Sequence, residues 1–237
     1  MGLQDKVVLI TGATGALGHV VARILAETGA RLVLTGRQQQ ALAGLVAEIG
    51  IAAGRALTLP ADLAVAKEVG ALVEAVAARW GGADILLNIA GGWRGGTRLA
   101  ELTEEEWDAT MEMNLRSAFL INRAVLPYMV SRGWGRIINI ASRAAAEPAA
   151  RQAAYNVSKA GIVALTASIA AEYRRQGVAA NAIMPSIIDT AQNRAQMPDA
   201  DFSRWVKPEA LAALMLYLCG EEGGSLNGAA IPVYGRV

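Results

Sequence analysis

The sequence has little of the two side chains that most often build metal sites and catalytic triads, because it holds one cysteine and one histidine among 237 residues. The lone Cys219 excludes an internal disulfide, so we expect a cytoplasmic location. The lone His19 excludes a site with several histidine ligands and a histidine-based triad anywhere else in the chain. We therefore expect no metal.

Strong net charge and long apolar runs are also missing. The net charge of +1 gives no support for a nucleic-acid surface or an anionic membrane surface as partner. No apolar run approaches the roughly 20 residues of a membrane span, and residues 1–6 lead straight into a strand rather than reading as a signal peptide. Hydrophobic residues make up 54% of the chain, which predicts one large domain over residues 1–237.

Short apolar runs alternate with longer segments of helical spacing. The predicted strands are 7–10, 32–35, 56–59, 84–89, 136–141, 178–183 and 229–233. The predicted helices are 16–28, 39–49, 64–80, 105–131, 152–175 and 208–219, and we expect Pro127 to kink or break the fourth. Because the strands are continuously apolar, the pattern predicts a single doubly wound, Rossmann-type α/β domain with a mainly parallel seven-stranded sheet.

The loop after the first strand is rich in glycine. It reads Thr-Gly-Ala-Thr-Gly-Ala-Leu-Gly over residues 11–18, with glycines at 12, 15 and 18. Such glycines permit a tight turn, close approach of a pyrophosphate and close packing of the following helix, whose free amides favour an anion. Three glycines alone describe only a turn, but their place between a strand and a helix favours a dinucleotide.

The second strand ends at Arg37, where a carboxylate would accept bonds from the adenosine ribose. No carboxylate is present, and the planar cation of Arg37 suits a 2′-phosphate. The sequence therefore favours NADPH over NADH. The alternative is that Arg37 merely faces solvent.

Tyr155 and Lys159 stand four residues apart, which places both on one face of a helix. At ~5 Å and an effective dielectric of about 20, an ammonium favours a phenolate by roughly 3 kcal/mol, or about two pKa units. A tyrosine tuned in this way can exchange a proton near neutral pH. Taken alone, the pair is also a common solvated helix pairing.

Taken together, these motifs resemble the short-chain dehydrogenase/reductase family over essentially the whole chain. Asp62-Leu63 fits the acidic residue after the third strand, and Asn88-Ile89-Ala90-Gly91 is similar to the motif after the fourth. The resemblance identifies four catalytic residues, namely Asn114, Ser142, Tyr155 and Lys159. It also implies the following cofactor contacts: Gly12, Thr14, Gly15, Ala16, Leu17, Gly18, Arg37, Asp62, Leu63, Asn88, Ala90, Gly91, Tyr155, Lys159, Pro185, Ile188 and Thr190.

The resemblance implies an NAD(P)-dependent oxidoreductase that acts on a small carbonyl or alcohol substrate. Tyr155 is expected to donate or accept the proton beside Ser142, while Lys159 lowers the pKa of Tyr155 and bonds the nicotinamide ribose. Asn114 is expected to hold a water, and Thr190 to grip the carboxamide. The resemblance also implies a homo-oligomer, either a tetramer or a dimer.

Two loops resemble those of dihydropteridine reductases in the same family. They are residues 90–96, around Trp93 and Arg94, and residues 189–205, which end at Trp205. We interpret these three side chains as candidates for the substrate wall, and residues 186–207 as a short lid. A quinonoid dihydropteridine reductase is therefore an alternative, although Ser142 and Arg37 depart from those enzymes. A non-catalytic dinucleotide sensor or scaffold is a further alternative, which the intact catalytic set disfavours.

Overall fold

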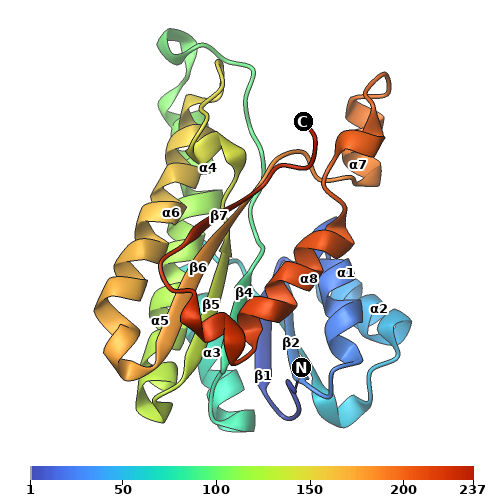
Figure 1. The fold of residues 1–237 in the computed structure, drawn as a ribbon, viewed down its shortest axis with the longest axis vertical. Helices are drawn as coiled ribbons and strands as arrows, with labels where there is room; N and C mark the ends of the chain where they lie inside the picture. The colour runs from blue at the N-terminus through green and yellow to red at the C-terminus, as the bar shows by residue number, and fades with distance from the viewer. Residues whose placement is uncertain (1) are drawn as a thin grey trace.

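The computed structural model describes residues 2–237, and its strands form one sheet in the order β3-β2-β1-β4-β5-β6-β7 (Figure 1). Every neighbouring pair of strands is parallel, which confirms the predicted doubly wound α/β fold. The sheet is wholly parallel, whereas the sequence predicted a mainly parallel one. The strands are β1 (Val7–Thr11), β2 (Arg31–Gly36), β3 (Ala56–Pro60), β4 (Ile85–Asn88), β5 (Gly135–Ile140), β6 (Val178–Pro185) and β7 (Ala230–Val233).

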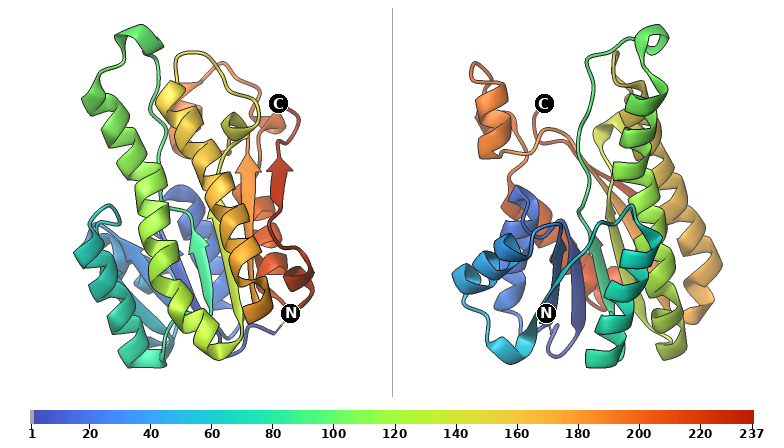
Figure 2. Two further views of the ribbon diagram at one scale, coloured as in Figure 1. Left: turned by 90° about the vertical axis from the view of Figure 1, so that its left-hand side faces the viewer. Right: turned by 180° about the vertical axis from the view of Figure 1, so that it is seen from behind.

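The sheet lies between two layers of helices, because its strands are apolar on both faces. In β1, Val8 and Ile10 face one core cluster while Val7 and Leu9 face the other. One layer holds α1 (Ala16–Ala26), α2 (Gln39–Ile49) and α8 (Pro208–Cys219), and the other holds α3 (Ala66–Trp80), α5 (Ser117–Arg132) and α6 (Ala153–Tyr173) (Figures 1 and 2). The remaining helices, α4 (Glu104–Met111) and α7 (Ala191–Gln196), flank the carboxyl ends of the strands.

The expected break at Pro127 is wrong, because α5 continues through this residue and ends at Arg132, with Gly133 as its C-cap. A proline inside a helix destabilises it by about 3 kcal/mol, but each fully buried apolar side chain stabilises the fold by about 1.5–3 kcal/mol. Helix α5 buries several of them, including Leu120, Ile121, Val125, Leu126 and Met129. The irregular turn lies instead at Glu112–Arg116, a π-helical segment between α4 and α5 that contains Asn114.

A chain of buried amide and hydroxyl groups crosses the centre of the sheet. The Thr11 hydroxyl donates to Asn88 at 2.9 Å, and Asn88 donates to the Asn139 side-chain oxygen at 2.9 Å. Asn122 donates to the same oxygen at 2.9 Å, and Asn139 donates to Thr166 at 3.0 Å. This polar chain links β1, β4 and β5 to α5 and α6, so it couples the strand ends that carry the loops to two helices of one layer.

Two kinds of feature are missing from the described residues. No helix within residues 2–237 combines the length and apolar character that a membrane crossing needs. Within the same residues, no three His, Cys, Asp or Glu side chains come together as a metal site requires. The feature that stands out is an opening at the carboxyl ends of the strands, where α7 stands apart from α4 and the start of α6 (Figure 1).

Candidate active site

A cleft of about 1730 Å³ occupies this opening and gathers most of the sequence-predicted residues on its wall. Those that line it are Gly12, Thr14, Gly15, Ala16, Leu17, Gly18, Arg37, Asp62, Leu63, Ala90, Gly91, Trp93, Arg94, Ser142, Tyr155, Lys159, Pro185 and Ile188. Parallel strands bring their carboxyl ends to one edge, which is why loops so far apart in sequence meet here. Asn88, Asn114, Thr190 and Trp205 do not line the cleft.

The glycine loop forms a close-fitting cradle at one end of the cleft. Gly12 has a φ of +63°, and a Cβ there would lie 3.0 Å from the backbone of Ala90. A Cβ on Gly18 would lie 2.2 Å from the Gly12 carbonyl oxygen, so the start of α1 packs directly on the loop. Helix α1 begins after Gly15 with no side-chain cap, which leaves its first-turn amides free for an anion. These residues fit the pyrophosphate of a dinucleotide.

The next part of the wall holds a free cation and a restrained carboxylate. Arg37 is exposed beside Gly36 and pairs with no acidic side chain of residues 2–237. The Asp62 carboxylate is bound within its own turn, where it accepts the Ala64 N–H at 2.9 Å. The cleft wall at Arg37 is therefore ready to receive a negative group.

Ser142, Tyr155 and Lys159 meet at the other end of the cleft. Ser142 follows β5, and its hydroxyl accepts the Ala144 N–H at 3.2 Å. Tyr155 and Lys159 lie one turn apart on α6, with Lys159 Nζ 5.8 Å from the centre of the Tyr155 ring. Lys159 is buried and donates to the Ile140 carbonyl oxygen at 3.0 Å. The spacing on the helix thus holds the ammonium beneath the phenol, as the sequence predicts.

The electrostatics of this pair differ from the expectation. Burial raises the pKa of Tyr155, against a smaller opposing effect of its hydrogen bond with Ser142. Burial also lowers the pKa of Lys159 to about 8. The predicted lowering of the Tyr155 pKa by Lys159 is therefore wrong for this structure. The two groups share a desolvated corner, and desolvation favours the neutral form of each.

Asn114 stands behind this corner and holds the loop that follows β4. Its side chain donates to the Gly92 carbonyl at 3.0 Å and accepts the Gly92 N–H at 3.1 Å. A Cβ on Gly91 would lie 2.7 Å from Asn114 Oδ1 and 3.3 Å from Lys159 Nζ. The π-helical turn therefore brings Asn114 next to Lys159, with only a glycine between them.

Three of the predicted side chains are engaged away from the cleft. Asn88 is bound within the polar chain that crosses the sheet. The Thr190 hydroxyl caps α7 by accepting the Asn193 N–H at 3.1 Å. Trp205 is 5% exposed and packs against Phe202, with ring centres 4.8 Å apart. Trp205 is therefore buried within residues 186–207 and does not line the cleft, in contrast to its expected place on the substrate wall.

The structure also adds residues that the sequence analysis missed. Arg143 and Glu147 line the cleft as an ion pair at 2.6 Å, and Gln152 lies one turn before Tyr155. Arg143 and Glu147 follow Ser142 closely in the sequence, and Gln152 precedes Tyr155 by three residues. This closeness to two predicted site residues is the sequence signal that could have pointed to them. Asp189 is a further case, because its carboxylate binds Arg194 at 2.5 and 2.9 Å and also binds Lys207.

The Asp189 contacts join the two ends of the segment that contains α7. Arg194 comes from α7 and Lys207 from the residue before α8, so one carboxylate joins three parts of the segment. These cations hold the pKa of Asp189 well below its usual range. A short parallel bridge between Ile188 and Val206 runs alongside. These contacts hold the two ends of the segment together beside α7, whose residues line part of the cleft.

A family model for short chain dehydrogenases matches residues 6–201. The chain belongs to the short-chain dehydrogenase family. It is thus an oxidoreductase enzyme, and enzymes of this family bind a nicotinamide cofactor. The glycine cradle and the Tyr155–Lys159 corner therefore form the two ends of one cleft in an enzyme of this family.

Similar proteins cover nearly the whole chain. D-beta-hydroxybutyrate dehydrogenase of Rhizobium meliloti is 33% identical, with 98% of each protein covered. The 3-oxoacyl-[acyl-carrier-protein] reductase of Vibrio cholerae is 32% identical and covers 99% of this chain and 98% of its own. L-sorbose reductase of Gluconobacter frateurii, solved with NADPH and L-sorbose, is 31% identical with a TM-score of 0.88 and covers 99% and 97%. These names do not favour the dihydropteridine reductase alternative.

Proposed function

We propose that this short-chain dehydrogenase transfers a hydride between NADPH and a small carbonyl or alcohol substrate, with Tyr155 as proton donor and acceptor. The observation that carries the proposal is the meeting of Ser142, Tyr155 and Lys159 on the wall of the cleft that also holds the glycine cradle. A phenol, a hydroxyl and an ammonium in one desolvated corner are suited to proton transfer at a single substrate oxygen.

Each side chain has a distinct part in the proposed reaction. When bound, the nicotinamide supplies or takes the hydride. The Ser142 hydroxyl donates a hydrogen bond to the substrate oxygen, and Tyr155 gives that oxygen its proton during reduction. Because burial raises the pKa of Tyr155, the phenol keeps its proton at neutral pH, which suits the direction of reduction. Lys159 bonds the nicotinamide ribose and, when protonated, stabilises the phenolate that forms.

The proposed preference for NADPH rests on Arg37. This exposed guanidinium has no acidic partner within residues 2–237, and no acidic residue stands at the end of β2, where a carboxylate would accept the ribose hydroxyls. The sorbose reductase solved with NADPH is consistent with this choice. Steady-state kinetics with both cofactors test it, and a clear preference for NADH would contradict it.

Replacement of Tyr155 by Phe tests the proton transfer. We expect turnover to fall by about 10²–10⁴-fold, which is the usual contribution of a positioned acid or base, while NADPH binding and the circular dichroism spectrum stay unchanged. Tyr217→Phe is the matched control, because Tyr217 is exposed on α8 and outside the cleft. Retained turnover in Tyr155→Phe, with the fold and cofactor binding intact, would refute the mechanism.

We further propose that residues 1–237 act as one catalytic domain in the cytoplasm, with residues 186–207 as a lid, and that the protein forms a dimer or tetramer. The outer faces of α5 and α6 support self-association, because Phe119 is 43% exposed and Val157 is 45% exposed on them. Light scattering measures the mass in solution, and a monomer at micromolar concentration would contradict this part of the proposal.

A further inference from the structure

A second cavity of about 350 Å³ lies beside the main cleft, between the loop after β4, the start of α4 and the start of α6. Three residues line both spaces, namely Trp93, Arg94 and Gln152. They therefore form the wall between the second cavity and the end of the cleft that holds Tyr155. A volume of this size is at the lower end of what small-molecule sites occupy.

The wall is held by one hydrogen bond rather than by packing. Trp93 Nε1 donates to Gln152 Oε1 at 2.7 Å, yet the Trp93 residue is 60% exposed. Gly95 leaves room for the indole, because a Cβ there would lie 2.8 Å from the Trp93 ring. Gln152 stands one turn before Tyr155, so the wall lies at the substrate end of the cleft. Movement of one side chain would join the two spaces.

The charges of the second cavity are unequal. Arg94 and Arg151 both line it, and neither side chain forms an ion pair with a residue of the described chain. Glu106 is the one acidic side chain among the lining residues, and its carboxylate accepts the Thr103 N–H at 3.3 Å. The lining thus carries two positive groups against one negative group. In contrast, Arg143 in the main cleft is neutralised by Glu147.

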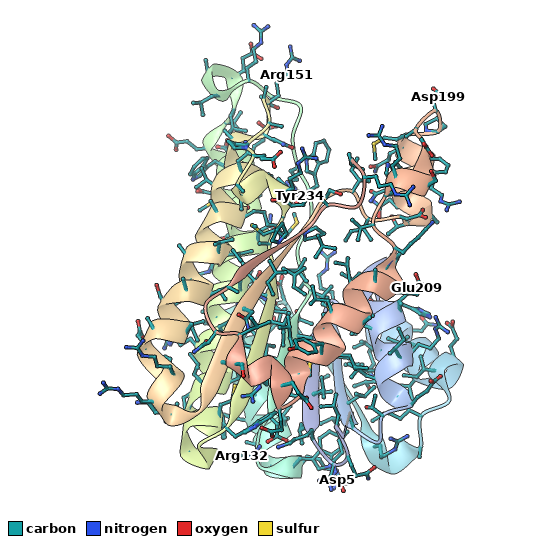
Figure 3. The ribbon with its side chains drawn as sticks, viewed as in Figure 1. Asp5, Arg132, Arg151, Asp199, Glu209 and Tyr234 are labelled. Carbon is teal, nitrogen blue, oxygen red and sulfur yellow. The ribbon has the colours of Figure 1, made fainter. Side chains whose placement is uncertain are left out.

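The backbone holds Arg151 where it can serve this cavity. Arg151 has a φ of +61°, in a region that non-glycine residues seldom adopt, and its carbonyl accepts the Gly96 N–H at 2.7 Å. Figure 3 shows Arg151 at the end of the molecule where the cleft opens, across from Asp199 of the lid. The position is reachable from the substrate end of the cleft without crossing the cofactor cradle.

We propose that the second cavity binds the anionic end of an extended substrate, whose carbonyl lies at Ser142 and Tyr155 and whose carboxylate is taken by Arg94 and Arg151. The Trp93–Gln152 pair then sets how far the carboxylate stands from the carbonyl. The favoured substrates are oxo acids or hydroxy acids with several carbons between the two groups. The inference rests on the proposed function, because it assigns the substrate class of the same site.

A matched series of substrates tests the subsite. We would measure kcat/KM with NADPH for 4-oxopentanoate, 5-oxohexanoate and 6-oxoheptanoate, and for the methyl ester of each. The wild-type enzyme is expected to prefer the acid over its ester by about tenfold at one chain length, which is the effect of one charged contact. Arg151→Ala and Arg94→Ala should each abolish the preference through a rise in KM for the acid. Arg98→Ala, an exposed arginine outside both cavities, should retain it.

Trp93→Phe tests the wall, because it keeps a ring and removes the donor to Gln152. We expect the preferred acid to become longer, with the ester rates unchanged. Equal kcat/KM for acid and ester at every length in the wild-type enzyme, or arginine variants that lower both alike, would overturn the inference while the reductase proposal stood.

If none of the ketones is turned over, binding measurements decide the subsite independently of the proposed function. Calorimetry with hexanoate and 1-hexanol should then show hexanoate binding that Arg151→Ala abolishes. No preference for hexanoate would overturn the inference.

Discussion

Replacing Lys159 by Met should stabilise the protein while abolishing its activity. Lys159 is 4% exposed, and its one hydrogen-bond acceptor is the Ile140 carbonyl at 3.0 Å. Burial lowers the pKa of Lys159 from 10.5 to about 8. The folded state therefore holds its ammonium at a cost, which methionine of similar length and flexibility removes.

The size of the effect follows from the pKa shift. A difference of about 2.5 pKa units corresponds to roughly 3 kcal/mol at 1.4 kcal/mol per unit. Loss of the bond to the Ile140 carbonyl offsets about 1–2 kcal/mol of this gain. The variant should therefore be about 1–2 kcal/mol more stable at pH 7, which raises the Tm of a chain of this size by roughly 2–8 °C.

The pH dependence gives the prediction its signature. Between pH 8 and 10.5 the unfolded state binds more protons at Lys159 than the folded state does, so wild-type stability rises with pH in this window. The advantage of Lys159→Met should therefore shrink as pH rises from 8 to 10.5. Urea unfolding of both proteins across this range measures it, with Lys67→Met on the exposed face of α3 as control. A variant that is less stable at pH 7, or an advantage that does not change with pH, would refute the reasoning.

Four further changes have expected outcomes. Arg37→Asp should lower kcat/KM for NADPH about 100-fold, because it replaces attraction for a 2′-phosphate by repulsion. The kcat/KM for NADH should stay within a few-fold of the wild-type value. An equal loss with both cofactors would contradict this prediction. Asp189→Asn should raise the KM for the carbonyl or alcohol substrate about fivefold and speed hydrogen exchange in residues 186–207, since two ion pairs weaken. Gly91→Ala should cost about 1–3 kcal/mol by thermal unfolding, because its φ is +151° and a Cβ would meet Asn114 Oδ1 at 2.7 Å. Gly44→Ala on α2, where nothing lies within 4 Å, should instead stabilise by about 0.5–1 kcal/mol.

The fold could be predicted because continuous apolar runs mark buried parallel strands. The run at residues 178–183 identified β6, although the strand continues to Pro185. The π-helical turn at Glu112–Arg116 could not be predicted in this way, because the apolar spacing passes through it without a break. The break predicted at Pro127 was wrong because it rested on local helix propensity alone. The burial of apolar side chains along α5 outweighs that propensity.

The position of Ser142 on the cleft wall was predictable because the residue directly follows β5. The positions of side chains that have partners elsewhere in the fold were not predictable. Asn88, Thr190 and Trp205 each find such partners, and no spacing in the sequence announces them. The direction of the Tyr155 pKa was missed because spacing gives the distance to Lys159 but not the burial of both groups.

The polar chain from Thr11 through Asn88, Asn139 and Asn122 to Thr166 constrains how this enzyme can be evolved in the laboratory. An apolar substitution at Thr11, Asn88 or Asn139 leaves a buried neighbour without a hydrogen-bond partner, and a buried unsatisfied group costs about 1–3 kcal/mol. A tolerated replacement at one of these positions therefore requires a simultaneous change of its hydrogen-bonded partner, which single-step mutagenesis rarely achieves. Libraries aimed at new substrates should leave this chain untouched and place their diversity in the loops at the cleft.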